Sequence, residues 1–125
     1  MKTKEILQPE WPSFFDGFSR QHEGWLVSLE LLGPEIGAQV EESELPFEGI
    51  VVDHDDYKND KITIMMGATT DSHIAHTINL PTQVSLEQTD NGADVALAIR
   101  GENETTTLLT FRVAVLPETV DAVGA

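Results

Sequence analysis

The alternation of hydrophobic and polar residues predicts one helix near the start of the chain. Between residues 13 and 24, aromatic residues recur at a helical spacing and form a stripe that docks on a core. Ser13 and Asp16 have the spacing of a capping box at the start of this helix, and Gly24 is placed to end it. The stripe consists of Phe14, Phe15 and Phe18.

From Trp25 onward the period of the pattern changes to two, which predicts strands. The segment 47–52 is either a strand of its own or the continuation of the preceding strand after a bulge. The turn Asp90-Asn91-Gly92 is typical of a tight connection between two strands. The strands are predicted at 25–32, 36–41, 47–52, 61–66, 73–79 and 83–88, around Val95, Leu97 and Ile99, and at 105–115 with Leu109, Phe111 and Val113 facing inward.

These elements indicate a mainly β protein of the α+β kind. We expect an N-terminal helix followed by about seven short, mostly antiparallel strands, forming a small barrel or a strongly bent sheet. Residues 1–10 are predicted to be a flexible arm, residues 11–117 a single domain, and residues 118–125 a frayed tail. The length of 125 residues fits one domain.

The net charge changes the picture of the partners. The chain has 22 acidic and 7 basic residues, a formal charge of −15, and residues 30–60 hold ten of the acids against the single Lys58. Phosphate backbones bind through lysine and arginine, so nucleic acid is not an expected partner. Without cysteine, a signal peptide or a long apolar stretch, we expect a soluble cytoplasmic protein with no membrane partner.

Two histidines are candidate metal ligands. His73 and His76 have a spacing that chelates a metal when it lies on a helix. Here the local pattern is a strand, so the two imidazoles should point to opposite faces. A joint site would need a bulge between them, and a hydrogen-bonded core or interface role for His76 is the alternative.

The acidic segment 53–60 is the other candidate cation site. Asp53 and Asp55 carry the carboxylates that hard cations prefer, but the EF-hand pattern fails because Tyr57, Lys58 and Ile64 occupy its required positions. A solvated loop is the alternative. Phosphate-binding glycine loops and nucleophile motifs are absent from the sequence, so we expect no enzyme, no catalytic residues and no cofactor.

The chain resembles a small bacterial family of unknown function. The resemblance is carried by the run from Phe14 to Val27, by Gly33-Pro34-Glu35-Ile36-Gly37-Ala38-Gln39, and by segments 45–50 and 76–82. It covers nearly the whole chain and implies a single-domain protein without an assigned activity.

A second likeness, in the order of elements alone, is to the Sm-like barrels, which also run from a helix into short bent strands. Residues 14–22 would be the helix, 25–32 the first strand and 36–52 the long bent second strand. Two features depart from that pattern. The chain has an additional hairpin at 95–115, and the basic and aromatic RNA-binding positions have no counterpart.

Four functions are compatible with these observations. The leading hypothesis is a non-enzymatic module that binds a protein partner or itself, because several strands carry apolar residues on both faces and need a cover. The alternatives are an acidic nucleic-acid mimic, which needs the acids of residues 30–60 on one face, a metal-dependent binder or enzyme centred on His73, His76 and Asp71, and an Sm-like RNA-binding barrel. The two-sided positions are Leu26, Leu32, Ile50, Val51 and Met65.

Overall fold

The computed structural model describes residues 2–34, 37–54, 60–67 and 73–111, and within them the chain is one helix and eight strands with two short 3-10 turns. The elements are β1 (Lys2–Ile6), η1 (Gln8–Glu10), α1 (Trp11–His22), β2 (Leu26–Gly33), β3 (Gly37–His54), β4 (Asp60–Met66), β5 (Ile74–Asn79), β6 (Gln83–Gln88), β7 (Asp94–Arg100), η3 (Glu102–Glu104) and β8 (Thr106–Phe111).

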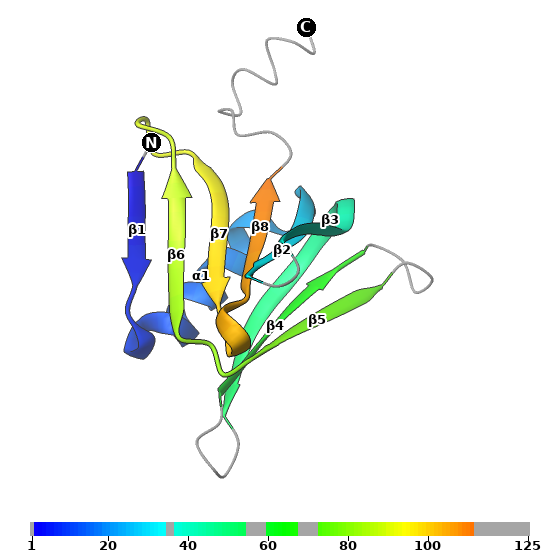
Figure 1. Cartoon of the computed structure of the whole chain (residues 1–125). Helices are drawn as coiled ribbons and strands as arrows, with labels where there is room; N and C mark the ends of the chain where they lie inside the picture. The colour runs from blue at the N-terminus through cyan, green and yellow to red at the C-terminus, as the bar shows by residue number, and fades with distance from the viewer. Residues whose placement is uncertain (1, 35–36, 55–59, 68–72, 112–125) are drawn as a thin grey trace, which may run out of the picture.

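The eight strands form one antiparallel sheet in the order β1-β6-β7-β8-β2-β3-β4-β5. Figure 1 shows β1, β6, β7 and β8 side by side, whereas β3, β4 and β5 run obliquely across the other half of the molecule. The sheet is therefore strongly bent, and β1 and β5 are its two edges. The predicted mainly β fold with one N-terminal helix and a bent sheet is confirmed.

The length of β3 produces the bend. Its first half, from Gly37 to Pro46, pairs with β2, and its second half, from Phe47 to His54, pairs with β4. Register shifts interrupt both ladders, as expected where β-bulges bend a strand. Of the two interpretations of segment 47–52, the continuation of the preceding strand is the correct one.

The core lies between the inward faces of the strands and α1. Successive strand residues alternate between the two faces, so every second residue of β4 and β8 is buried. Phe15 and Phe18 of α1 are buried among them, and Phe14 packs at the margin of the same cluster. The largest side chains with almost no exposure to solvent are Phe15, Phe47, Leu29, Ile50, Ile62, Ile64, Met66, Leu97, Ile99 and Leu109.

The expected flexible N-terminal arm is wrong. Lys2–Ile6 pairs along its whole length with β6, from Lys2 opposite Gln88 to Ile6 opposite Val84. Ile6 is 3% exposed, and its carbonyl accepts a hydrogen bond of 2.9 Å from the indole of the buried Trp11. The other four side chains of β1 are exposed, so the strand has no hydrophobic pattern and is held by its partner's backbone.

The start of the helix also differs from the prediction. α1 begins at Trp11, and Pro12 occupies its first turn, where the missing N–H costs no hydrogen bond. Ser13 donates to the carbonyl of Glu10 and Asp16 pairs with Arg20 at 2.6 Å, so the two do not form a capping box. Gly24 ends the helical segment at φ +88°, as predicted.

Several other expectations can be followed in the structure. Gly92 closes the turn between β6 and β7 at φ +88°. The predicted tail 118–125, the inward position of Val113, and the candidates Asp55 and Asp71 lie outside the described residues. Among the helices of the described chain, none has the length and apolar character needed to cross a membrane.

Candidate functional site

The edge of the sheet formed by β5 exposes backbone hydrogen-bonding groups. In an antiparallel pair, successive residues point their N–H and C=O groups alternately toward the partner and away from it. The N–H of Leu80 donates to Asp60, and the hydroxyl of Ser19 bonds both the N–H and the C=O of Ile50. The first bond makes Asp60 and Leu80 a hydrogen-bonded pair of the β4–β5 ladder, and such pairs recur at every second position. The alternation that starts from Ile50 in the β3–β4 ladder agrees with this. Ala75 and Thr77 fall at the positions between these pairs, so they direct their backbone groups away from β4.

The two edges of the sheet differ in chemistry. β1 carries Lys2, Lys4 and Glu5, and charged side chains of this kind hinder the addition of another strand. β5 has the sequence Ile-Ala-His-Thr-Ile-Asn, without lysine, arginine, acid or proline. In a chain with a net charge of −15, a strand without acids at an open edge is suited to pairing with another strand.

A pocket with a volume of about 160 Å³ lies beside this edge, between β5 and the turn η3. We call it the β5 pocket. The absence of a side chain at Gly101 brings the two elements together, because a Cβ there would lie 2.6 Å from Cγ2 of Ile78 and 3.0 Å from the carbonyl of Asn79. The pocket is lined by Leu31, His76, Thr77, Ile78, Asn79, Gly101, Glu102, Asn103, Thr105 and Thr107.

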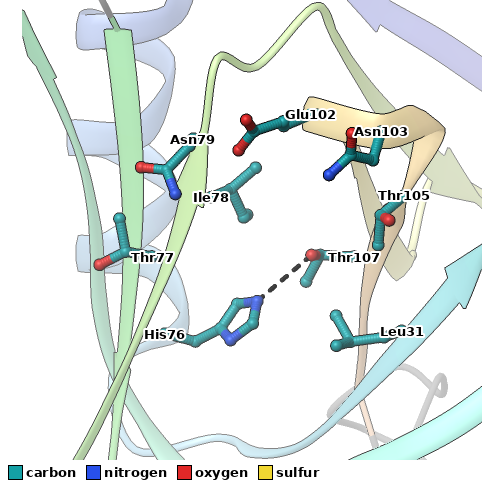
Figure 2. Close-up of a pocket in the computed structure, with 10 residues that line it drawn as sticks. Leu31, His76, Thr77, Ile78, Asn79, Glu102, Asn103, Thr105 and Thr107 are labelled. Carbon is teal, nitrogen blue, oxygen red and sulfur yellow. Dashed lines mark hydrogen bonds between the residues drawn. The ribbon is translucent and has the colours of Figure 1, made fainter.

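Figure 2 shows how these side chains are arranged. Glu102, Asn103 and Asn79 stand together at one end of the pocket, and His76 and Leu31 stand at the other. The hydroxyl of Thr77 points away, so this residue meets the pocket with its edge backbone. The pocket therefore combines a carboxylate, two amides and strand-edge groups with the apolar walls of Leu31 and Ile78.

The two predicted histidines have different neighbours. Nε2 of His76 lies 3.4 Å from the hydroxyl of Thr107, which is buried on β8, so this contact joins β5 to the far half of the sheet. Nδ1 of His73 lies 2.7 Å from Oε2 of Glu48, with both side chains well exposed. The structure does not bring the two imidazoles together. The described residues contain no cluster of three or more histidine, aspartate or glutamate side chains able to hold a metal.

The described acids of residues 30–60 are spread along the sheet. Glu44 lies in the half of β3 that pairs with β2, whereas Asp53 lies at the other end and faces Lys61 across the ladder. Glu48, between them, is paired with His73. An acidic mimic of a phosphate backbone needs one row of exposed carboxylates, and of these three Glu48 is already held by His73.

The two tryptophans have structural positions that the sequence left open. Trp11 is buried at the start of α1, whereas Trp25 is 39% exposed and makes T-shaped ring contacts with His22 and Phe111. Trp25 therefore covers part of the core and keeps one side in solvent.

A buried ion pair was missed by the sequence reasoning. His22 is 2% exposed, and its Nε2 lies 2.8 Å from Oδ2 of Asp94 on β7. Its Nδ1 lies 2.8 Å from the carbonyl of Phe18, and its ring stacks on Phe111 at 4.6 Å. His22 follows Phe15 and Phe18 on the same helical stripe, and this spacing is the signal that could have identified it as a core residue.

The chemistry of this pair is structural. A carbonyl only accepts hydrogen bonds, so Nδ1 of His22 donates, and Nε2 donates as well while Asp94 is ionised. The hydrogen bond from His22 holds the pKa of Asp94 below its ordinary value against the opposing effect of burial, and a bond from Gln88 at 2.8 Å adds to this. With both ring nitrogens bound to acceptors, His22 is not placed to act as a general base.

The apolar residues on two faces of the strands are only partly covered. Leu26, Leu32 and Met65 are partly buried, whereas Val51 is 44% exposed on the outer face of β3. Near it, α1 and the outer sides of β3 and β4 border a hollow of about 410 Å³ that Pro12 and Met65 help to line. Asp16 and Glu48 also line this hollow, so the outer surface here carries acidic side chains as well as apolar ones.

The fold and this edge define a small β-sheet domain with an edge strand that carries no charged side chains. Residues 2–119 match a family of unknown function (DUF5335), and the chain belongs to this family. An uncharacterized protein from Aquifex aeolicus (strain VF5) is 31% identical over 119 residues, which is 94% of this chain and all of the relative. No solved structure matches the chain. The predicted membership in a bacterial family of unknown function is confirmed.

Proposed function

We propose that the protein is a non-enzymatic interaction module that receives an extended segment of a partner protein along the edge of β5. The observation that carries this proposal is the difference between the two edges of the sheet. β1 has the charges that hinder strand addition, and β5 has none at the positions where Ala75 and Thr77 direct their backbone groups outward. Strand addition supplies affinity through main-chain hydrogen bonds.

The charge of the chain favours a partner protein over a second copy. Two copies with a formal charge of −15 each repel one another, whereas a neutral or basic segment does not. The distribution of the lysine and arginine side chains disfavours RNA as a partner. Among the described basic residues, Arg20 is paired with Asp16 and Arg100 with Glu104, and the lysines lie on β1 and β4. These positions do not form a basic surface.

The test uses a variant that blocks the edge without breaking the sheet. Ala75→Pro removes an N–H that faces away from β4, so no ladder bond is lost, and proline is tolerated on edge strands at such positions. Ala75→Val is the matched control, because it alters the side chain and keeps the N–H. Peptides are selected from a random library of displayed decapeptides against the wild-type chain, and their affinities for both variants are then measured.

We expect the selected peptides to bind Ala75→Val like the wild type and to bind Ala75→Pro about tenfold more weakly or worse, since a main-chain bond is lost and the ring obstructs the edge. Peptides that bind all three proteins equally would show that β5 is not the site. A dimer in solution that Ala75→Pro converts to monomer would overturn the partner-protein version, because the occupant would then be a second copy.

A further inference from the structure

We infer that the β5 pocket selects the partner, and that it takes a lysine side chain projecting from the segment that pairs with β5. This inference rests on the proposed function, because the strand brings the lysine to the pocket. When an antiparallel strand is added, residues directly opposite one another place their side chains on the same face of the sheet. His76 faces inward on β5, so the partner residue opposite it also points inward, toward the pocket, whereas η3 lies against Asn79 at the end of the strand.

The size and the walls of the pocket fit an alkylammonium group. Its volume of about 160 Å³ is roughly ten times the ~10–15 Å³ that a cavity needs to hold one water molecule, which leaves room for the four methylenes and one ammonium of a lysine side chain. Leu31 and Ile78 provide apolar contact for the methylenes. The acceptor groups stand beyond them, at the end formed by η3.

The charges at the pocket and on the whole chain favour a positively charged ligand. The carboxylate of Glu102 stands at the pocket beside the amides of Asn79 and Asn103, and a lysine ammonium offers three donors to acceptors of this kind. No described basic side chain is paired with Glu102, since Arg100 pairs with Glu104 instead. The charge of −15 on the whole chain also favours the approach of a cation.

The backbone of η3 is held in a form that keeps these groups at β5. Asn103 and Glu104 have φ values of +60° and +59°, and left-handed conformations at residues other than glycine cost free energy. Gly101 packs closely against β5, and the turn can approach the strand in this way only without a Cβ at this position. The pocket is therefore formed before any ligand arrives, which lowers the entropy lost on binding.

The test separates the pocket from the edge with four probes, followed in amide spectra of the full chain. n-Butylammonium represents the lysine side chain alone, and n-butanol is its uncharged control. The peptide acetyl-Thr-Val-Lys-Val-Thr-amide adds the strand, and the same peptide with norleucine in place of lysine keeps the strand and the methylenes without the charge.

We expect n-butylammonium to shift the signals of Asn79, Asn103 and Thr105, and n-butanol to shift them far less. The lysine peptide should shift Ala75 and Thr77 as well, and bind about fivefold more tightly than the norleucine peptide. Glu102→Gln should remove most of that difference. Glu5→Gln, which removes an equal charge at the opposite edge, should leave it unchanged.

Two outcomes distinguish the failures. If both peptides shift Ala75 and Thr77 and bind with the same Kd, the lysine inference is overturned while the proposed edge function stands. If neither peptide shifts these two residues, the edge function is refuted, even when n-butylammonium enters the pocket. Shifts by n-butylammonium that are scattered over the acidic surface would refute the pocket itself.

Discussion

The pair formed by His22 and Asp94 gives the sharpest prediction about stability. Asp94→Ala removes the acceptor of Nε2 and leaves a ring that is 2% exposed with an unsatisfied donor. Hydrogen bonds to charged groups contribute about 1.5–3 kcal/mol, and breaking a buried pair costs about 3–5 kcal/mol. The Asp94 side chain is 16% exposed, so water reaches the site, and we expect a loss of about 2–3 kcal/mol at pH 7.

The dependence on pH follows from the lowered pKa of Asp94. A carboxyl whose pKa is lower in the folded than in the unfolded chain stabilises the fold above its unfolded pKa, and this contribution is lost as the pH falls through the folded pKa. The wild type should therefore exceed Asp94→Ala by the full amount above about pH 4 and by less below it. Urea unfolding followed by circular dichroism, repeated between pH 3 and pH 7, measures the difference.

A double-mutant cycle with His22→Phe isolates the interaction. Phenylalanine keeps the ring that stacks on Phe111 but lacks both donors, so the double variant should be more stable than the sum of the single losses by about 1.5–3 kcal/mol. Gln88→Ala is the control, because it removes one neutral donor to Asp94 and leaves the histidine in place. Single effects that add within about 0.5 kcal/mol, or a difference from Asp94→Ala that stays constant down to pH 3, would refute this reasoning.

Three further substitutions and one deletion test the fold by the same unfolding measurements. Gly17→Ala should stabilise the chain by about 0.5–1 kcal/mol, because nothing lies within 4 Å of the added carbon in the helix. Gly101→Ala should destabilise it by about 1–3 kcal/mol, because its Cβ would lie 2.6 Å from a β5 side chain. Equal effects of the two substitutions would contradict the packing at η3. Ser19→Ala should cost about 1 kcal/mol, since the edge groups of Ile50 lose their hydroxyl partner, and Ser19→Thr, which retains a hydroxyl, is its comparison. Deletion of residues 2–6 should cost at least about 2 kcal/mol through the lost burial of one isoleucine, and an unchanged midpoint would mean that the segment is a free arm after all.

Much of the fold could be predicted because it is recorded in local patterns. Strand β6 has the predicted bounds, since alternation along a half-buried strand reports directly which residues face the core. Gly24 and Gly92 were identified at their turns because few other residues adopt a positive φ at so little cost. The phenylalanine stripe of α1 was found for the same reason, as a periodicity within a few residues.

The candidate site could be predicted only in part. His76 was identified as a residue of an inward face, but its partner Thr107 is 31 positions away, and no periodicity relates the two. The first strand was missed because its side chains are polar and its pairing with β6 uses the backbone. His22 was passed over for a similar reason, since the carboxylate that binds it lies on β7.

The sequence by itself determined the class of fold, the faces of the strands and the principal turns, because each is recorded in patterns of neighbouring residues. It also determined the unusual charge, because that is a sum over all the residues. Only the tertiary structure decided that β5 forms an open edge, that Gly101 brings η3 against it, and that Glu102 stands at the resulting pocket. These are contacts between distant segments, and they form only when the whole core closes.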